Sequence, residues 1–180
     1  KSKTYVGDIA MNYSDIKFTD MINGKGIRVT LFVSGCTHRC KGCFNKETWD
    51  SEYGVPFTEE IQENILEYFK RFDSAMQGLS LLGGDPTYYK NVEPLTEFTA
   101  EFKKRFPQKN IWIWSGFTWE QIITDPKKYA LMKNCDVLID GKFTEELKDV
   151  NLKWRGSSNQ RVIDIQATIE NNNEVVLYEN

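Results

Sequence analysis

The chain has 180 residues, of which 40% are hydrophobic and 27% are charged, and its formal net charge is −3. This apolar content supports a buried core and argues against disorder. The absence of a basic excess argues against a nucleic-acid partner. No apolar run approaches the roughly 18 residues of a membrane helix, and the first residues lack the apolar run of a signal peptide. We therefore expect one cytoplasmic domain over residues 1–180, with no membrane contact.

Strand-like and helix-like patterns alternate along the chain. The segment up to about Met21 has only weak strand content. Four short apolar runs then suit buried parallel strands; they are residues 28–34, 79–84, 111–116 and 136–141. Helical spacing fills the gaps between these runs; the expected helices follow Thr58, run from Pro94 to Phe106, follow Thr118, and run from Asp125 to about Lys133.

Several residues mark the expected ends of these helices. Thr58 is a good N-cap, and Thr118 with Gln121 forms a capping box. Pro94 suits a first helical turn. The tail, residues 161–180, has two further apolar runs that predict strands, with an edge hairpin around residues 171–173.

The order of elements predicts an α/β fold with parallel strands and right-handed crossovers. In such sheets, ligands bind beyond the carboxyl ends of the strands. The four strands end in the loops SGCTHRCKGC, GGDP, SGFT and DGKF. We expect these loops to meet on one rim and to form a functional site.

The first of these loops carries three cysteines, Cys36, Cys40 and Cys43, with no fourth nearby. An iron–sulfur cluster usually takes four thiolates, so three would leave one iron of a cubic cluster open. A zinc site that includes His38 is the alternative, but a histidine two residues after a ligand has too short a tether to close a tetrahedron comfortably. We expect Cys135 to be a small buried hydrophobe at the opposite end of the sheet.

The other three loops offer weaker signals. Gly83 and Gly84 would let a ligand approach the backbone, although a plain strand-to-helix turn has the same sequence. Asp140 and Lys142 form either a screened surface pair or a site for a zwitterionic or ribose-bearing ligand. Ser115 is either a ligand hydroxyl or part of a turn before the next helix.

The segment RGSSNQR, residues 155–161, has no apolar residue. A solvated loop is the simplest interpretation. Its amides and arginines also suit recognition of a carboxylate, a phosphate or a peptide backbone.

The cysteine motif, followed by Phe44 and by GGDP on the next strand, resembles that of the radical S-adenosylmethionine enzymes. From about Asp20 to Asp164 the chain resembles the activating proteins of anaerobic ribonucleoside-triphosphate reductases. The narrower resemblance depends on NG-x-G-x-R at residues 23–28 and on RGSSNQR.

The resemblance implies a partial (β/α) barrel with outer helices and a core of about residues 20–164. It implies a [4Fe-4S] cluster on the three cysteines and S-adenosylmethionine on the open iron, with no catalytic side chain beyond these cofactors. It also implies that the adenine lies near Gly42, Cys43 and Phe44, the methionine amino group near Gly83, Gly84 and Asp85, and the ribose and carboxylate near Ser115, Asp140 and Lys142.

The reaction implied is reductive cleavage of S-adenosylmethionine with an electron from flavodoxin or ferredoxin. The resulting 5′-deoxyadenosyl radical would take a hydrogen from a glycine in the C-terminal region of the reductase. The alternatives are a small-molecule radical enzyme such as a deazapurine synthase, an iron–sulfur electron carrier, and a zinc-stapled interaction module.

Overall fold

The computed structural model describes residues 11–180, which form one seven-stranded sheet in the order β3-β1-β2-β4-β5-β6-β7. The strands are β1 (Asn12–Asp20), β2 (Arg28–Val33), β3 (Val55–Pro56), β4 (Gly78–Gly83), β5 (Asn110–Trp114), β6 (Val137–Asp140) and β7 (Arg161–Asp164). The helices are α1 (Glu59–Arg71), α2 (Tyr89–Arg105), α3 (Trp119–Ile122), α4 (Pro126–Lys133) and α5 (Ile165–Glu170), with short 3₁₀ helices η1 (Lys46–Trp49) and η2 (Glu145–Leu147). Within the described residues, no helix has the length and apolar character needed to cross a bilayer.

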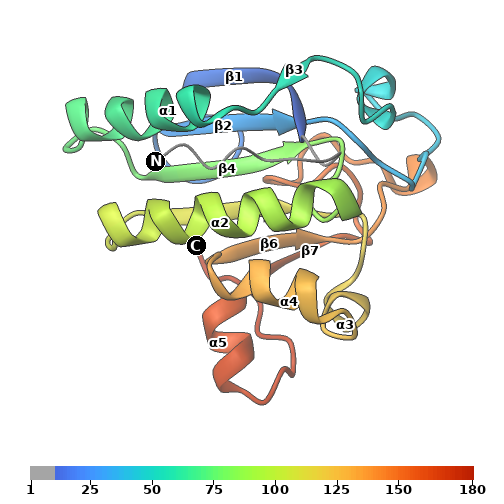
Figure 1. Ribbon diagram of the computed structural model, residues 1–180. Coiled ribbons are helices and arrows are strands. Elements are labelled where there is room, and N and C mark those ends of the chain that lie inside the picture. Colours follow the sequence, from blue (N-terminus) through green and yellow to red (C-terminus); the bar gives the residue numbers. More distant parts are fainter. Residues whose placement is uncertain (1–10) are drawn as a thin grey trace.

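The centre of the sheet is parallel, which confirms the α/β prediction. Strands β2, β4, β5 and β6 pair in parallel, and α1, α2 and α4 cover one face of the sheet (Figure 1). Strands β1, β3 and β7 pair antiparallel and form the flanks. Because β3 and β7 end the strand order without pairing to each other, the sheet is open, and the expected barrel is not confirmed.

The two faces of the sheet have different partners because side chains alternate along each strand. On the helix-covered face, Leu31, Leu81 and Ile113 are fully buried against the helices. The opposite face carries a separate aromatic cluster around Trp112, joined by Trp154. This second cluster forms a wall that leads toward the carboxyl ends of the strands.

The expected helix starts are confirmed at three places. The Thr58 side chain accepts from the α1 backbone, the capping box of Thr118 and Gln121 is formed at α3, and Asp125 caps α4. The prediction for Pro94 is wrong, because α2 begins at Tyr89 and the proline lies inside it. A proline at this position cannot donate to the carbonyl one turn earlier, and α2 nevertheless continues through it to Arg105.

Both ends of the chain differ from the expectation. Strand β1 is nine residues long and pairs with β2, whereas only weak strand content is expected there from the sequence. The rest of that segment, residues 1–10, lies outside the described residues. The predicted C-terminal hairpin is wrong. Strand β7 stops at Asp164, whose carboxylate caps α5 by accepting from Ala167 N at 3.0 Å. Beyond the helix, the chain returns antiparallel beside β7 over a few residues, through an isolated bridge between Ile163 and Leu177 and the backbone bonds Asp164 N to Val176 O and Tyr178 N to Val162 O, both 2.9 Å.

Candidate functional site

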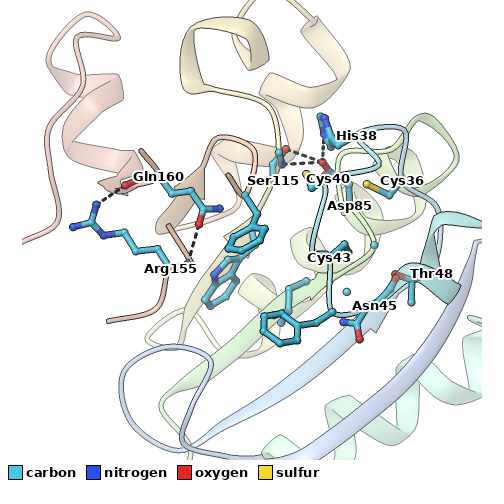
Figure 2. Close-up of a pocket in the computed structure, with 18 of the residues that line it drawn as sticks. Cys36, His38, Cys40, Cys43, Asn45, Thr48, Asp85, Ser115, Arg155 and Gln160 are labelled. Carbon is cyan, nitrogen blue, oxygen red and sulfur yellow. Dashed lines mark hydrogen bonds and ion pairs between the residues drawn. The ribbon is translucent and has the colours of Figure 1, made fainter. Parts of the chain in front are cut away.

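A cavity of about 610 Å³ opens beyond the carboxyl ends of the parallel strands (Figure 2). The sequence predicted that the strand-end loops meet there, and each of the four loops contributes to its lining. Of the predicted site residues, it is lined by Cys36, Cys40, Cys43, Phe44, Gly83, Gly84, Asp85 and Ser115. Gly42, Asp140 and Lys142 do not line it.

The cysteine loop leaves β2 and is closed at its base by η1. Gly35 N donates to Thr48 O at 2.7 Å, and Cys36 N donates to Trp49 O at 3.3 Å. Gly35 has a φ of +102°, a conformation that glycine adopts without strain. The base of the loop is therefore fixed by backbone contacts, while its three cysteines line the cavity (Figure 2).

The donor set fits a cluster better than a single ion. In the part of the chain that the structure describes, no three His, Cys, Asp or Glu side chains converge as ligands of one metal ion. Thiolates on different irons of a cubic cluster stand further apart than the ligands of one ion. Cys135 is fully buried before β6, where its thiol donates to Leu131 O at 3.4 Å, so it is no fourth ligand. Burial raises the pKa of the Cys36 thiol to about 11, so a metal must displace its proton on binding.

The GGDP turn is joined directly to the base of the cysteine loop. Gly84 N donates to Val33 O at 2.7 Å, and Asp85 N donates to Gly35 O at 2.8 Å. A Cβ on Gly84 would lie 2.7 Å from Gly35 O and 2.9 Å from Thr48 O, closer than real side chains come. Both amides thus donate within the protein, and the groups of the turn that could accept from a ligand's ammonium group are its glycine carbonyl oxygens.

The carboxylate of Asp85 is the centre of a buried hydrogen-bond network. His38 Nε2, Ser115 Oγ and Gly116 N lie 2.7, 3.1 and 3.0 Å from its Oδ2. Thr87 donates to its Oδ1 from N at 2.7 Å and from Oγ1 at 2.8 Å. Burial alone would raise the pKa of Asp85, but the hydrogen bonds from His38 and Thr87 lower it below its ordinary value.

This network changes what two residues can do. The Ser115 hydroxyl donates to Asp85, accepts from Phe117 N at 3.1 Å and lies 2.9 Å from Thr87 Oγ1, so it is committed within the protein. His38, which we considered only as a zinc ligand, instead joins the cysteine loop to the GGDP turn. The sequence signal for this role was its position as the only histidine, between two cysteines.

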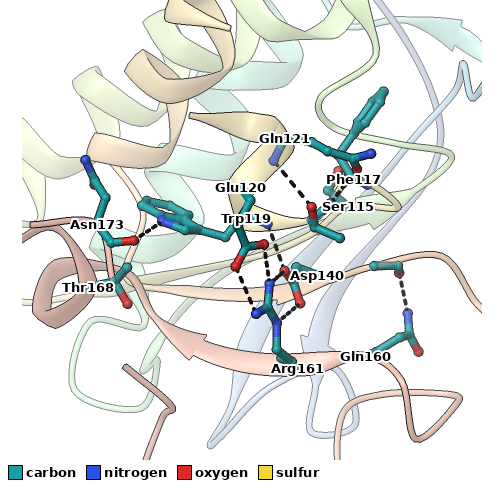
Figure 3. Close-up of polar contacts among 12 residues, drawn as sticks. Ser115, Phe117, Trp119, Glu120, Gln121, Asp140, Gln160, Arg161, Thr168 and Asn173 are labelled. Atoms are coloured by element: carbon teal, nitrogen blue, oxygen red, sulfur yellow. Dashed lines mark hydrogen bonds and ion pairs between the residues drawn. The ribbon is translucent and has the colours of Figure 1, made fainter. Parts of the chain in front are cut away.

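Asp140 and Lys142 lie beside the cavity, in a neighbouring depression. The Asp140 carboxylate is 1% exposed and is held by Arg161, with Nε at 3.1 Å and Nη2 at 2.5 Å, and by Trp119 N at 2.8 Å (Figure 3). Arg161 also binds the exposed Glu120. The β6–β7 register sets Asp140 opposite Arg161, so these contacts give Asp140 a structural role.

The polar loop RGSSNQR lines the cavity but binds mainly to itself. Gln160 Oε1 accepts from Gly156 N at 2.9 Å, and its Nε2 donates to Gly141 O at 3.0 Å. Arg155 Nη1 donates to Gln160 O at 2.6 Å, with its guanidinium directed away from the cysteines (Figure 2). These side chains brace the loop against the turn after β6.

The motif NG-x-G-x-R supports a second part of the cavity wall, which Asn23 lines. Arg28 is fully buried and donates five hydrogen bonds, including one to Ser80 Oγ at 2.7 Å. Ser80 Oγ in turn donates to Asn23 O at 2.6 Å, and Asp20 accepts from Asn23 Nδ2 at 2.6 Å. The motif thus holds Ile22 and Asn23 at the cavity.

Comparison with known proteins agrees with this site. The family model for a 4Fe-4S single cluster domain matches residues 22–163. The chain is 46% identical over 150 residues to the anaerobic ribonucleoside-triphosphate reductase-activating protein of Haemophilus influenzae, covering 83% of this chain and 96% of the relative. The proteins of the same name from Pasteurella multocida and Escherichia coli are 44% and 41% identical, over 83% and 84% of this chain and 95% and 97% of theirs. With three cysteines on one cavity and this identity along most of its length, the chain belongs to the family of anaerobic ribonucleoside-triphosphate reductase-activating proteins.

Proposed function

We propose that this protein generates a glycyl radical on an anaerobic ribonucleoside-triphosphate reductase, using S-adenosylmethionine and a [4Fe-4S] cluster. The observation that carries the proposal is the donor set: three cysteines share one cavity at the carboxyl ends of the strands, and the remaining cysteine, Cys135, is buried away from it. An iron without a protein ligand is free to take the amino and carboxylate groups of a cosubstrate.

The residues of the chain bind and orient the cofactors. Cys36, Cys40 and Cys43 would hold three irons, and the carbonyl oxygens of the Gly83–Gly84 turn would accept from the methionine ammonium. Phe44 lines the cavity with 80% of its surface exposed and is available to the adenine. When bound, the cluster supplies the electron that cleaves the sulfonium, giving methionine and the 5′-deoxyadenosyl radical that takes a glycine Cα hydrogen.

A protein substrate suits the shape of the site. Ile22 and Phe44, 77% and 80% exposed, both line the cavity and place apolar side chains at its mouth. Glycine has no side chain, so a segment from the C-terminal region of the reductase could bring its Cα close to the cofactor. We propose a flavodoxin or ferredoxin as the reductant, and the cytoplasm as the location.

The test is anaerobic reconstitution with iron and sulfide, followed by dithionite, S-adenosylmethionine and a reductase of the type that the relatives activate. The expected result is a glycyl-radical doublet in the electron-spin resonance spectrum, with methionine and 5′-deoxyadenosine as products. Cys40→Ala should lose both cluster and radical, whereas the control Cys135→Ala, far from the cavity, should keep both.

Other outcomes would favour the other functions. Intact S-adenosylmethionine beside a reduced cluster would indicate an electron carrier. Turnover of a small molecule with no radical on the reductase would indicate a small-molecule radical enzyme.

A further inference from the structure

The side chain of His38 makes a buried contact at the middle of the cysteine loop. It is 6% exposed, and its ring packs edge-on against Phe117 with centroids 4.5 Å apart. A Cβ on Gly116 would lie 2.4 Å from its Cδ2, so the ring fits a slot that only glycine leaves open. This packing aims Nε2 at the Asp85 carboxylate, 2.7 Å away.

The acceptor of this bond is itself immobile. Asp85 follows the two glycines of the GGDP turn, and its carboxylate is oriented by Thr87, Ser115 and Gly116. An ionised carboxylate can only accept, so Nε2 carries the hydrogen. The bond therefore ties the cysteine loop to a fixed point beside the backbone that we propose for S-adenosylmethionine.

The charged side chains that contact this part of the loop from elsewhere, or extend from it, do so at the surface. Lys41, 80% exposed, pairs with Glu145 at 3.4 Å, and Lys148 lies 5.4 Å from the centre of the Phe44 ring. Exposed ion pairs contribute little to stability, whereas a buried hydrogen bond to a charged group contributes more. His38 thus makes the strongest tie between the middle of the loop and the sheet.

We propose that His38 is a positioning residue whose bond to Asp85 sets the cysteine loop, and the cluster on it, in register with the backbone that binds S-adenosylmethionine. The inference rests on the proposed function. It assigns no chemical step to the imidazole. Its consequence is that loss of the bond weakens cosubstrate binding while all three cysteines stay in place.

Two amide variants of the full chain form a matched pair. In glutamine, Nε2 is four bonds from Cα, as in histidine, so His38→Gln keeps a donor that reaches Asp85. In asparagine the nitrogen is three bonds from Cα, so His38→Asn keeps the amide but loses the reach. We expect both to bind iron and sulfide as the wild type does. We expect the dissociation constant of S-adenosylmethionine to rise about tenfold in His38→Asn and about twofold or less in His38→Gln.

A second measurement uses the metal-free chain. Hydrogen exchange of residues 36–44 should speed up in His38→Asn and stay near the wild-type rate in His38→Gln. Gly116→Ala provides an independent perturbation, because its new Cβ pushes the ring off Asp85 without changing the loop's sequence. It should speed exchange in the same segment.

Equal behaviour of the two amide variants, in both affinity and exchange, would overturn the proposal. So would a Gly116→Ala chain with unchanged protection of the cysteine loop, a result that stands even if His38→Asn fails to fold. None of these measurements uses the reductase. Absence of a glycyl radical with the wild type would therefore reject the proposed function without deciding this one.

Discussion

Replacing Asp140 by asparagine separates a structural carboxylate from a cofactor ligand. The family resemblance implies that Asp140 lies near the ribose and carboxylate of S-adenosylmethionine, and the structure shows its carboxylate held by Arg161 and Trp119. The asparagine amide would keep one acceptor oxygen for Trp119 but would lose the charge and half of the two-point contact with Arg161. We expect the metal-free chain to lose stability even without cofactor.

The magnitude follows from burial and geometry. Removing one partner of a fully buried ion pair costs about 3–5 kcal/mol. The Arg161 side chain is 33% exposed and retains Glu120, so solvent screens part of this interaction. We therefore expect a loss of about 2–3 kcal/mol. Glu120→Gln is the matched control: it makes the same change on the same arginine, but at a carboxylate that is 60% exposed, and should cost about 0–1 kcal/mol.

The assay is urea unfolding of the metal-free chain followed by tryptophan fluorescence. With a slope of about 2 kcal/mol per M, Asp140→Asn should lower the midpoint by about 1 M and Glu120→Gln by less than about 0.5 M. Equal midpoints for the two variants would refute the structural role. A normal midpoint combined with lost S-adenosylmethionine affinity would restore Asp140 as a cofactor ligand.

Three further predictions concern residues in the wall of the cavity or behind it. Arg28→Lys should lower the free energy of unfolding by about 2–5 kcal/mol, because an ammonium keeps the buried charge but cannot serve five acceptors; a urea midpoint within error of the wild type would contradict this. Burial would raise the pKa of Asp20, but its hydrogen bonds, led by that from Asn23, lower it below the ordinary 3.8. Ionised Asp20 therefore stabilises the fold above pH 3.8, and this contribution is lost as the pH falls through the lowered pKa. The urea midpoint of Asp20→Asn should therefore fall less between neutral and acidic pH than the midpoint of the wild type. Parallel pH profiles of the two midpoints would contradict this. Gly84→Ala should bind less iron and should lower the free energy of unfolding by about 1–3 kcal/mol, because its Cβ meets backbone oxygens at the base of the cysteine loop. Full iron binding in a stable Gly84→Ala chain would show that the backbone of the turn moves to accommodate the Cβ.

Local chemistry made much of this protein predictable from sequence. The apolar runs and caps specified the parallel strands and the starts of α1, α3 and α4, because strand burial and N-capping depend on a few neighbouring residues. The three cysteines indicated a cluster because their number and spacing are properties of the chain itself. The common rim followed from the rule that parallel strands end together.

Contacts between distant segments were beyond the reach of the sequence pattern. Asp140 and Lys142 follow a strand as ligand residues do, yet β7 sets Arg161 opposite Asp140 and satisfies that carboxylate inside the protein. The tail is a different case. Its residues are strand-like, but the Asp164 carboxylate accepts from Ala167 N three residues later and caps a helix, so this was a local signal that the strand pattern concealed.

The sequence alone therefore determined the central parallel strands, three helix starts and which atoms can hold a cluster, since these depend on residues near one another in the chain. Only the tertiary structure decided that the sheet stays open, and that His38 and Asp85, 47 positions apart, meet behind the cysteines. A hydrogen bond requires two atoms to come within about 3 Å, and only the packing of whole strands and loops brings distant residues that close.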